Sequence, residues 1–223
     1  MGKDDYYDAS LAVNGKPLFV EWEKGERSSH PGTPSVRLAE YRIFILTLFK
    51  RHVAENSQVI SLGCGNGFTE RLLKEHGFQV LGTDVHSSAL QLCREKGVDV
   101  RHLDVLAVPD GFGVFDVVYS DGLMGHLWDG EAAFSRFIDN LLKLLAEGGI
   151  AILSNDLSDS DNGPCTAVTG APEATFYRGV PGYVGEQLGM SDELSVIEEH
   201  IYEYERKGRG LRRREIVVAR RLN

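Results

Sequence analysis

Long apolar runs and closely paired cysteines are missing from this sequence of 223 residues. No apolar stretch approaches the ~18 residues of a membrane-spanning helix, so we expect no membrane partner. Residues 1–5 are acidic and lack an apolar segment, which argues against a signal peptide. The cysteines, Cys64, Cys93 and Cys165, are widely spaced, which excludes a disulfide framework and a zinc site. Together these absences predict a cytoplasmic location.

A surplus of basic residues is missing too. Lysine and arginine number 24 against 33 aspartates and glutamates, giving a formal net charge of −9. Enzymes that modify DNA or RNA need a basic face for the phosphates, so this balance predicts no nucleic-acid partner. One basic cluster does occur near the C-terminus, at Arg206, Lys207, Arg209, Arg212, Arg213 and Arg214. We interpret it as the solvated tip of a hairpin, with an RNA-contacting hairpin as the alternative.

Strand-like and helix-like segments alternate along most of the chain. Residues 35–54 have a helical rhythm, with an apolar face of Val36, Leu38, Ile43, Leu46 and Phe49 or Val53. The alternating segments that follow are 58–62, 68–76, 78–83, 87–96, 98–102, 115–120, 131–146 and 149–154. Two extended segments, 195–206 and 211–221, end the chain. Alternation of this kind predicts an α/β fold with a parallel sheet, whose ligands lie beyond the carboxyl ends of the strands.

The most informative stretch is the glycine-rich run Gly63-Cys64-Gly65-Asn66-Gly67, directly after the first expected strand. Glycines at alternate positions allow positive φ angles and leave no Cβ between the backbone and a ligand. The helix that follows points its positive end at whatever binds there. A dinucleotide-binding turn needs another glycine three residues after Gly65, but Phe68 stands there. The turn therefore predicts a nucleotide-like ligand and weakens, without excluding, an NAD-type oxidoreductase.

The G-x-G-x-G spacing resembles the first motif of class I S-adenosylmethionine-dependent methyltransferases, in which the loop passes under the cofactor. Asp84 ends the second expected strand, where a carboxylate can accept two hydrogen bonds from ribose hydroxyls. Asp104 follows the third strand and resembles the family's adenine-binding acid, with a helix or turn cap as the alternative. The resemblance implies a Rossmann-like three-layer sandwich, with a mostly parallel seven-stranded sheet and a C-terminal antiparallel hairpin.

The same resemblance implies the cofactor S-adenosylmethionine and the product S-adenosylhomocysteine. The residues expected to bind them are Gly63, Cys64, Gly65, Gly67, Asp84, Val85, Asp104, Val105, Ser120 and Asp121.

The segment after the fourth strand holds the candidate base, His126. An imidazole suits proton transfer near neutral pH, but a pocket-shaping role is the alternative, since a His-Leu here recurs in methyltransferases with different mechanisms. The segment lacks the Asn/Asp-Pro-Pro motif of enzymes that methylate base amino groups. Asp121, Asn155 and Asp156 superficially echo the magnesium ligands of catechol-type enzymes. Loop caps explain the same residues, so no metal is predicted.

The remaining segments are assigned to the substrate side. Residues 1–35 look irregular and are predicted to form an N-terminal arm, with the methyltransferase domain spanning 36–223. Residues 156–190 lose all pattern and are predicted to be an insertion that covers the substrate. Tyr6-Tyr7-Asp8 resembles the tyrosine-bearing entry segment of small-molecule methyltransferases. The expected substrate-binding residues are Tyr7, Trp22, His126, Asp156 and Tyr177, although Tyr7 and Trp22 could simply pack the arm onto the sheet.

These observations favour a methyltransferase that acts on an oxygen or nitrogen of a small neutral or cationic acceptor. Methylation of RNA or of a protein side chain is one alternative, and a non-catalytic cofactor-binding regulatory module is another. The sequence leaves the oligomeric state open between a monomer and a homodimer.

Overall fold

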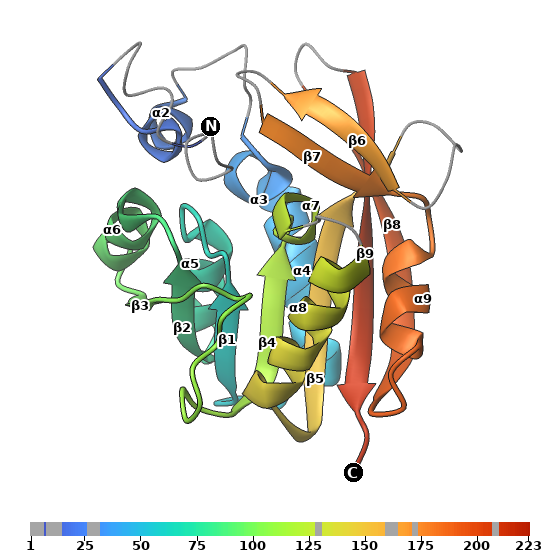
Figure 1. The fold of residues 1–223 in the computed structure, drawn as a ribbon. Coiled ribbons are helices and arrows are strands. Elements are labelled where there is room, and N and C mark those ends of the chain that lie inside the picture. Colours follow the sequence, from blue (N-terminus) through green and yellow to red (C-terminus); the bar gives the residue numbers. More distant parts are fainter. Residues whose placement is uncertain are drawn as a thin grey trace.

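A seven-stranded sheet forms the centre of the computed structural model, which describes residues 7, 15–25, 32–127, 131–158, 165–170, 174–206 and 210–223. The strand order is β3-β2-β1-β4-β5-β9-β8 (Figure 1). The strands are β1 (Gln58–Leu62), β2 (Gln79–Asp84), β3 (Asp99–His102), β4 (Phe115–Asp121), β5 (Leu145–Asp156), β8 (Leu194–Arg206) and β9 (Gly210–Arg221). Only β9 runs against its neighbours within this sheet. The predicted Rossmann-like sandwich with a closing antiparallel hairpin is confirmed.

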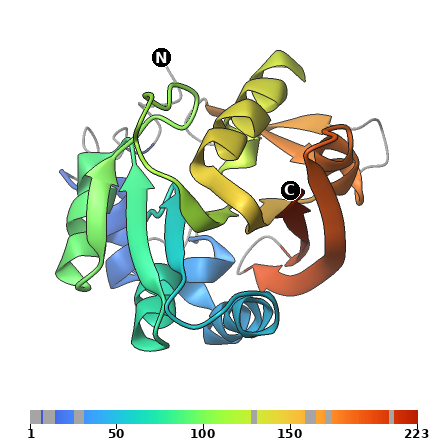
Figure 2. The same cartoon turned by 90° about the horizontal axis from the view of Figure 1, so that it is seen from below.

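Helices cover both faces of the sheet. One face packs against α4 (Ala39–His52), α5 (Phe68–Glu75) and α6 (Ser87–Glu95), and the other against α8 (Glu131–Leu144) and α9 (Tyr183–Gly189). Seen from below the sheet, α4 and α5 lie on the opposite side from α8 (Figure 2). Among the helices that the structure describes, none is long and apolar enough to cross a membrane.

The two apolar cores follow from the alternation of side chains along each strand. In β1, Val59 packs against α4 and α5, whereas Ile60 packs into the core under α8. In β4, Val117 and Val118 divide between the two cores in the same way. Strands buried on both faces must be almost entirely apolar, which is why β4 was recognisable in the sequence.

The N-terminal part is more regular than expected. Residues 18–24 form a helix, α2 (Leu18–Lys24), and a short helix α3 (Pro34–Arg37) precedes α4. The helix expected over 35–54 is interrupted at Leu38, whose φ of −113° and ψ of 111° are extended. The expected apolar face was also wrong at Ile43, which is 57% exposed, while Tyr41 and Ile45 point into the core.

The segment 155–190 is not patternless, as the sequence analysis expected. Strand β5 continues to Asp156, and the antiparallel pair β6 (Cys165–Gly170) and β7 (Ala174–Gly179) then forms a second sheet. In Figure 1 this pair lies at the carboxyl end of the main sheet. The expected boundary at 131–146 also shifts, because α8 ends at Leu144 and β5 begins at Leu145. The pairing of β5 with β4 then skips from Leu145 to Ile150, so the four residues between them bulge out of the ladder.

The C-terminal hairpin matches its expected bounds closely, but the basic cluster does not lie wholly at a solvated tip. Arg214 is only 1% exposed and pairs in register with Asp156 of β5. The interpretation was therefore wrong for Arg214, because an interior strand neighbour with a carboxylate replaces water around its guanidinium. Lys207 and Arg209 lie outside the described residues.

Candidate functional site

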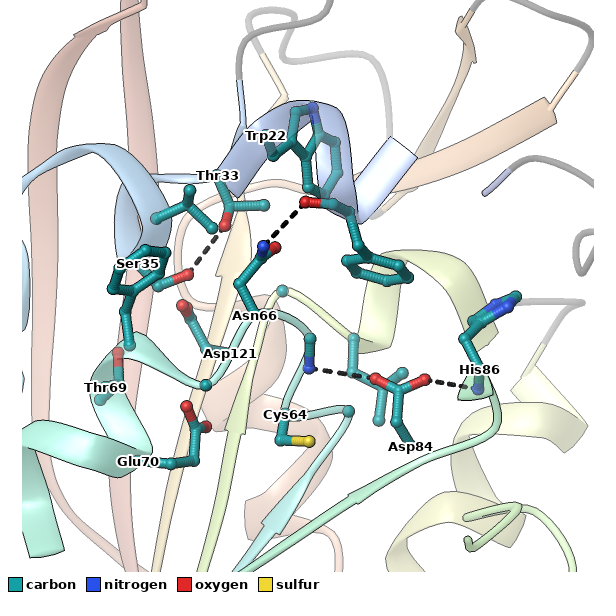
Figure 3. Close-up of a pocket in the computed structure, with 18 of the residues that line it drawn as sticks. Trp22, Thr33, Ser35, Cys64, Asn66, Thr69, Glu70, Asp84, His86 and Asp121 are labelled. Carbon is teal, nitrogen blue, oxygen red and sulfur yellow. Dashed lines mark hydrogen bonds between the residues drawn. The ribbon is translucent and has the colours of Figure 1, made fainter. Parts of the chain in front are cut away.

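A pocket opens beyond the carboxyl ends of β1, β2 and β4, where the strand order reverses (Figure 3). We call it the glycine-turn pocket. It encloses about 960 Å³, part of it open to solvent, which is the size of a small-molecule or cofactor site. Its floor is the turn 63–67, and residues of α2 and α3 lie over it. The position is the one that the sequence predicted for a ligand of a doubly wound sheet.

The glycine turn has no room for a side chain at Gly67. Gly65 has a φ of +50° and Gly67 a φ of +74°, both in the left-handed region. A Cβ on Gly67 would come within 2.7 Å of the Cys93 Sγ and 2.9 Å of its Cα, so the turn lies directly on α6. Cys64 is buried beside them and lines the pocket. The alternate glycines thus fulfil the steric role expected from their spacing.

Asp84 ends β2 and holds the turn in place. Its Oδ2 accepts a hydrogen bond from the backbone N–H of Gly65 at 3.1 Å, and its Oδ1 accepts one from the N–H of His86 at 2.9 Å (Figure 3). Burial raises the pKa of this carboxyl, and the two backbone N–H groups oppose that rise. Each oxygen keeps a lone pair for a ligand, as a ribose-binding carboxylate requires. Val85 beside it also lines the pocket.

Aromatic rings form the roof. The Tyr7 ring stacks on Phe19 with centroids 4.5 Å apart and an interplanar angle of 5°, and it meets Trp22 edge-on at 6.0 Å. Asn66 fastens this roof to the glycine turn, because its Nδ2 donates to the Phe19 carbonyl at 2.9 Å and to the Glu23 Oε2 at 2.9 Å. Stacked rings of this kind provide apolar walls for a flat ligand. Tyr6 and Asp8 lie outside the described residues.

Glu70 is a pocket residue that the sequence analysis missed. It lies in the first turn of α5, is buried, and accepts a hydrogen bond from the Ser61 Oγ at 2.6 Å. Burial raises the pKa of its carboxyl to about 7, and the charges of Asp121 and Asp84 add to the rise. Asp84 lies on one side of the glycine turn, and Glu70 and Asp121 lie together on the other (Figure 3). The available signal was its place three residues after Gly67, facing back toward the turn.

The raised pKa of Glu70 predicts a stability effect. Between its ordinary value of 4.5 and its folded value of about 7, only the folded protein keeps the proton, so stability falls as pH rises through this window. In Glu70→Gln this loss disappears. We therefore expect the free energy of unfolding of the wild type to fall, from pH 5 to pH 8, by roughly 2 kcal/mol more than that of the variant.

Urea denaturation of both proteins at the two pH values measures this difference. Glu215, whose pKa is also raised to about 7, contributes equally to both proteins and cancels. Parallel pH curves for the wild type and the variant would contradict the prediction.

A second pocket of about 550 Å³ adjoins the first, and we call it the arginine pocket. Five residues line both: Tyr7, Trp22, Thr33, Gly122 and His126. The remaining residues of the arginine pocket are Gly125, Asn155, Asp156, Tyr177, Arg178, Arg206 and Arg214. All five predicted substrate-side residues thus line this pocket, including Asp156 and Tyr177.

The two pockets meet at His126 and Tyr7. The Tyr7 hydroxyl lies 3.3 Å from Nδ1 and 3.2 Å from Nε2 of His126, and the two rings stack with centroids 5.6 Å apart. A phenol and an imidazole at the boundary of two cavities can bind and relay a proton. His126, the candidate base, therefore lies where a ligand in the glycine-turn pocket would face a ligand in the arginine pocket.

Arg214 joins the floors of both pockets, and the sequence analysis missed this role. Its Nη1 donates to the Asp121 Oδ1 at 2.5 Å, and its Nε donates to the Asp156 Oδ1 at 2.8 Å. Tyr41 donates to Asp121 at 2.7 Å, and Tyr204 donates to Asp156 at 3.1 Å. Burial alone would raise the pKa of Asp156, but Arg214, Arg178 and Arg206 outweigh it and lower the pKa to about 2. The carboxylates that echoed a magnesium site are thus engaged with a guanidinium.

Three residues expected at the cofactor line neither pocket. Asp104 is exposed, and its Oδ1 accepts from the N–H of Leu106 at 2.9 Å, which is a turn-capping contact. Val105 packs in the apolar core, and the buried Ser120 donates to the Leu62 carbonyl at 3.3 Å. The other seven predicted cofactor residues all line the glycine-turn pocket.

Comparisons with known proteins agree with this architecture. A family model described as a methyltransferase domain matches residues 59–149. The chain is 29% identical to a tabtoxin biosynthesis enzyme of Pseudomonas amygdali pv. tabaci, over 97% of this chain and 86% of that protein.

Two solved structures are similar in fold. The glycopeptide N-methyltransferase MtfA complexed with S-adenosyl-L-homocysteine has a TM-score of 0.63 and 17% identity over 96% of both chains. A structure from work on conversion of a disulfide bond into a thioacetal group during echinomycin biosynthesis has a TM-score of 0.65 and 17% identity over 92% of both chains.

Proposed function

Because the chain belongs to the class I S-adenosylmethionine-dependent methyltransferases, we propose that it methylates an oxygen or nitrogen of a small-molecule acceptor. The observation that supports this acceptor class is the meeting of two adjoining pockets at Tyr7 and His126. A cofactor in one pocket and a small acceptor in the other would face each other there. The similarity to a tabtoxin biosynthesis enzyme over nearly the whole chain agrees with a role in making a specialised metabolite. A cytoplasmic location and a monomeric or homodimeric state stay predictions.

The residues of the glycine-turn pocket fit the cofactor. The turn 63–67 leaves its backbone open to a ligand, and Asp84 offers acceptor lone pairs to ribose hydroxyls. Asp121 Oδ2 is buried and has no hydrogen-bond partner among the described residues, so it is available to a cationic group such as the ammonium of a bound amino acid. Glu70 adds a second carboxyl beside it. Asp104, Val105 and Ser120 line neither pocket, so their expected role in cofactor binding stays a prediction.

The proposed chemistry assigns a proton acceptor to this chain. S-adenosylmethionine supplies an activated methyl group on a sulfonium. The chain must align the acceptor, exclude water and take a proton from a hydroxyl or an ammonium that reacts. We assign the proton to a ring nitrogen of His126, with the Tyr7 hydroxyl as the partner that orients the ring. The aromatic roof of Tyr7, Phe19 and Trp22 would exclude water from the boundary between the two pockets.

The test of the proposed function is release of S-adenosylhomocysteine in the presence of different acceptors. The full chain and S-adenosylmethionine are incubated with panels of small phenols, amines and amino acid derivatives, and separately with total RNA and with denatured protein. We expect turnover only with members of the small-molecule panels. Turnover with RNA or protein alone, or cofactor binding without turnover on any acceptor, would reject the proposal.

Replacing Asp84 tests the cofactor contacts directly. In Asp84→Ala the charge-assisted bonds to the ribose and to the turn are lost, which should weaken S-adenosylhomocysteine binding by about 2 kcal/mol, roughly thirtyfold in Kd. Calorimetric titration measures the constant. Asp99→Ala is the matched control, because the Asp99 side chain is 85% exposed at the start of β3. A change of less than threefold in a folded Asp84→Ala protein would contradict the assignment.

A further inference from the structure

We propose that the acceptor carries a carboxylate and that Arg178 binds this group in the arginine pocket. The inference rests on the proposed function and narrows its substrate class to carboxylic acids. The carboxylate is a recognition group here, while the methylated oxygen or nitrogen lies elsewhere on the acceptor. This differs from the neutral or cationic acceptor that the net charge of the whole chain favoured.

Charge within the pocket supports the proposal. Arg178, Arg206 and Arg214 all line it, and the carboxylate side chain in the same lining is Asp156. Arg214 divides its guanidinium between Asp156 and Asp121, which neutralises it locally. Arg178 adds a positive charge to this lining. A monoanion balances that charge, whereas a cationic acceptor would be repelled.

Arg178 is the residue that would bind the carboxylate of the acceptor. It follows Tyr177 in β7, and it lies close enough to Asp156 to help lower the pKa of that carboxyl. Among the described residues, no carboxylate lies within ion-pair distance of Arg178. A partly buried guanidinium with its fork unengaged matches the planar geometry of a carboxylate.

The fold also fixes the position of Arg178 relative to His126, at the boundary of the two pockets. A Cβ on Gly125 would come within 2.6 Å of the Tyr177 carbonyl, so β7 packs directly against α7 (Met124–Leu127). His126 is on the same short helix. Leu157 forms a bridge to Gly179 as well, which ties the end of β7 to the end of β5. An acid bound at Arg178 would therefore present the rest of its structure to the boundary with the glycine-turn pocket.

The experiment compares a matched acid and amide on the full chain saturated with S-adenosylhomocysteine. N-acetyl-L-tyrosine is the monoanionic probe, N-acetyl-L-tyrosine amide is its neutral counterpart, and phenyl phosphate is the dianionic one. Dissociation constants are measured by ligand-observed NMR for the wild type, Arg178→Gln, Arg178→Lys and the control Arg220→Gln. Arg220 is an exposed residue of β9 that lines neither pocket.

We expect the acid to bind at least tenfold more tightly than the amide. Arg178→Gln should abolish this preference, Arg178→Lys should restore part of it, and Arg220→Gln should leave it unchanged. Equal binding of acid and amide by the wild type, no binding of the acid, or tighter binding of phenyl phosphate would overturn the proposal. The wild-type comparison stands even if Arg178→Gln fails to fold.

The affinity for S-adenosylhomocysteine, measured in the same samples, separates the two conclusions. It should be unchanged in Arg178→Gln, because Arg178 does not line the glycine-turn pocket. If the protein binds the cofactor and turns over neutral acceptors, the proposal that the acceptor carries a carboxylate is wrong, but the proposed function stands. Absence of turnover on every small acceptor would reject the proposed function, whatever the acid–amide comparison gives.

Discussion

Arg214→Met should lower the free energy of unfolding by about 3–5 kcal/mol, because it removes the guanidinium that the Asp121 and Asp156 carboxylates share. Asp121 and Asp156 both accept from Arg214, and their other donors are neutral hydroxyls. Methionine has a similar length and no charge. The side chain is 1% exposed, so water cannot replace the guanidinium without opening the structure.

Urea denaturation at pH 7 measures the loss, and a charge-balanced variant tests its cause. Adding Asp121→Asn and Asp156→Asn to Arg214→Met removes the unpaired charges and should recover most of the stability. Arg220→Met is the matched control on the same strand and should change stability by less than about 0.5 kcal/mol. If the triple variant is no more stable than Arg214→Met, the loss arises from packing and the electrostatic explanation fails.

His126→Asn should reduce kcat about a hundredfold or more once an acceptor is known, which is the usual scale of a positioned proton acceptor. The affinity for S-adenosylhomocysteine should change little, because the proposed cofactor contacts are those of the glycine turn, Asp84 and Asp121. Any pH dependence of the wild-type rate that arises from the proton acceptor should disappear in the variant.

Two further variants separate a proton acceptor from a residue that only shapes the pocket. Tyr7→Phe removes the hydroxyl next to the His126 ring and should reduce kcat less, since only orientation is lost. His102→Asn changes an exposed histidine at the end of β3 and should have no effect. A pH–rate profile of unchanged shape in His126→Asn would contradict the proton-acceptor role, even if kcat falls.

The parts of the fold that sequence reasoning recovered are those with a local cause. The alternate glycines at 63, 65 and 67 need only the steric rule for positive φ and for close approach to α6. Asp84 was found because it ends a strand next to that turn. The apolar run of β4 likewise indicates, within a few consecutive residues, a strand that is buried on both faces.

The parts that were missed depend on distant segments. Arg214 is surrounded in sequence by other arginines and reads as surface, but strand pairing places it opposite Asp156 and next to Asp121. The pair β6 and β7 escaped notice because two six-residue strands of mixed apolar and polar residues give no clear alternation. Glu70 looked like an ordinary residue of an amphipathic helix, and the structure shows that its carboxyl is buried and bonded to Ser61.

The ring of Tyr7 lines both pockets at once, and this couples the two binding steps. It packs on Phe19 over the glycine-turn pocket, and it contacts His126 at the edge of the arginine pocket. Any displacement that admits one molecule also alters the space left for the other. The affinity of each pocket for its substrate is therefore expected to depend on whether the other pocket is occupied.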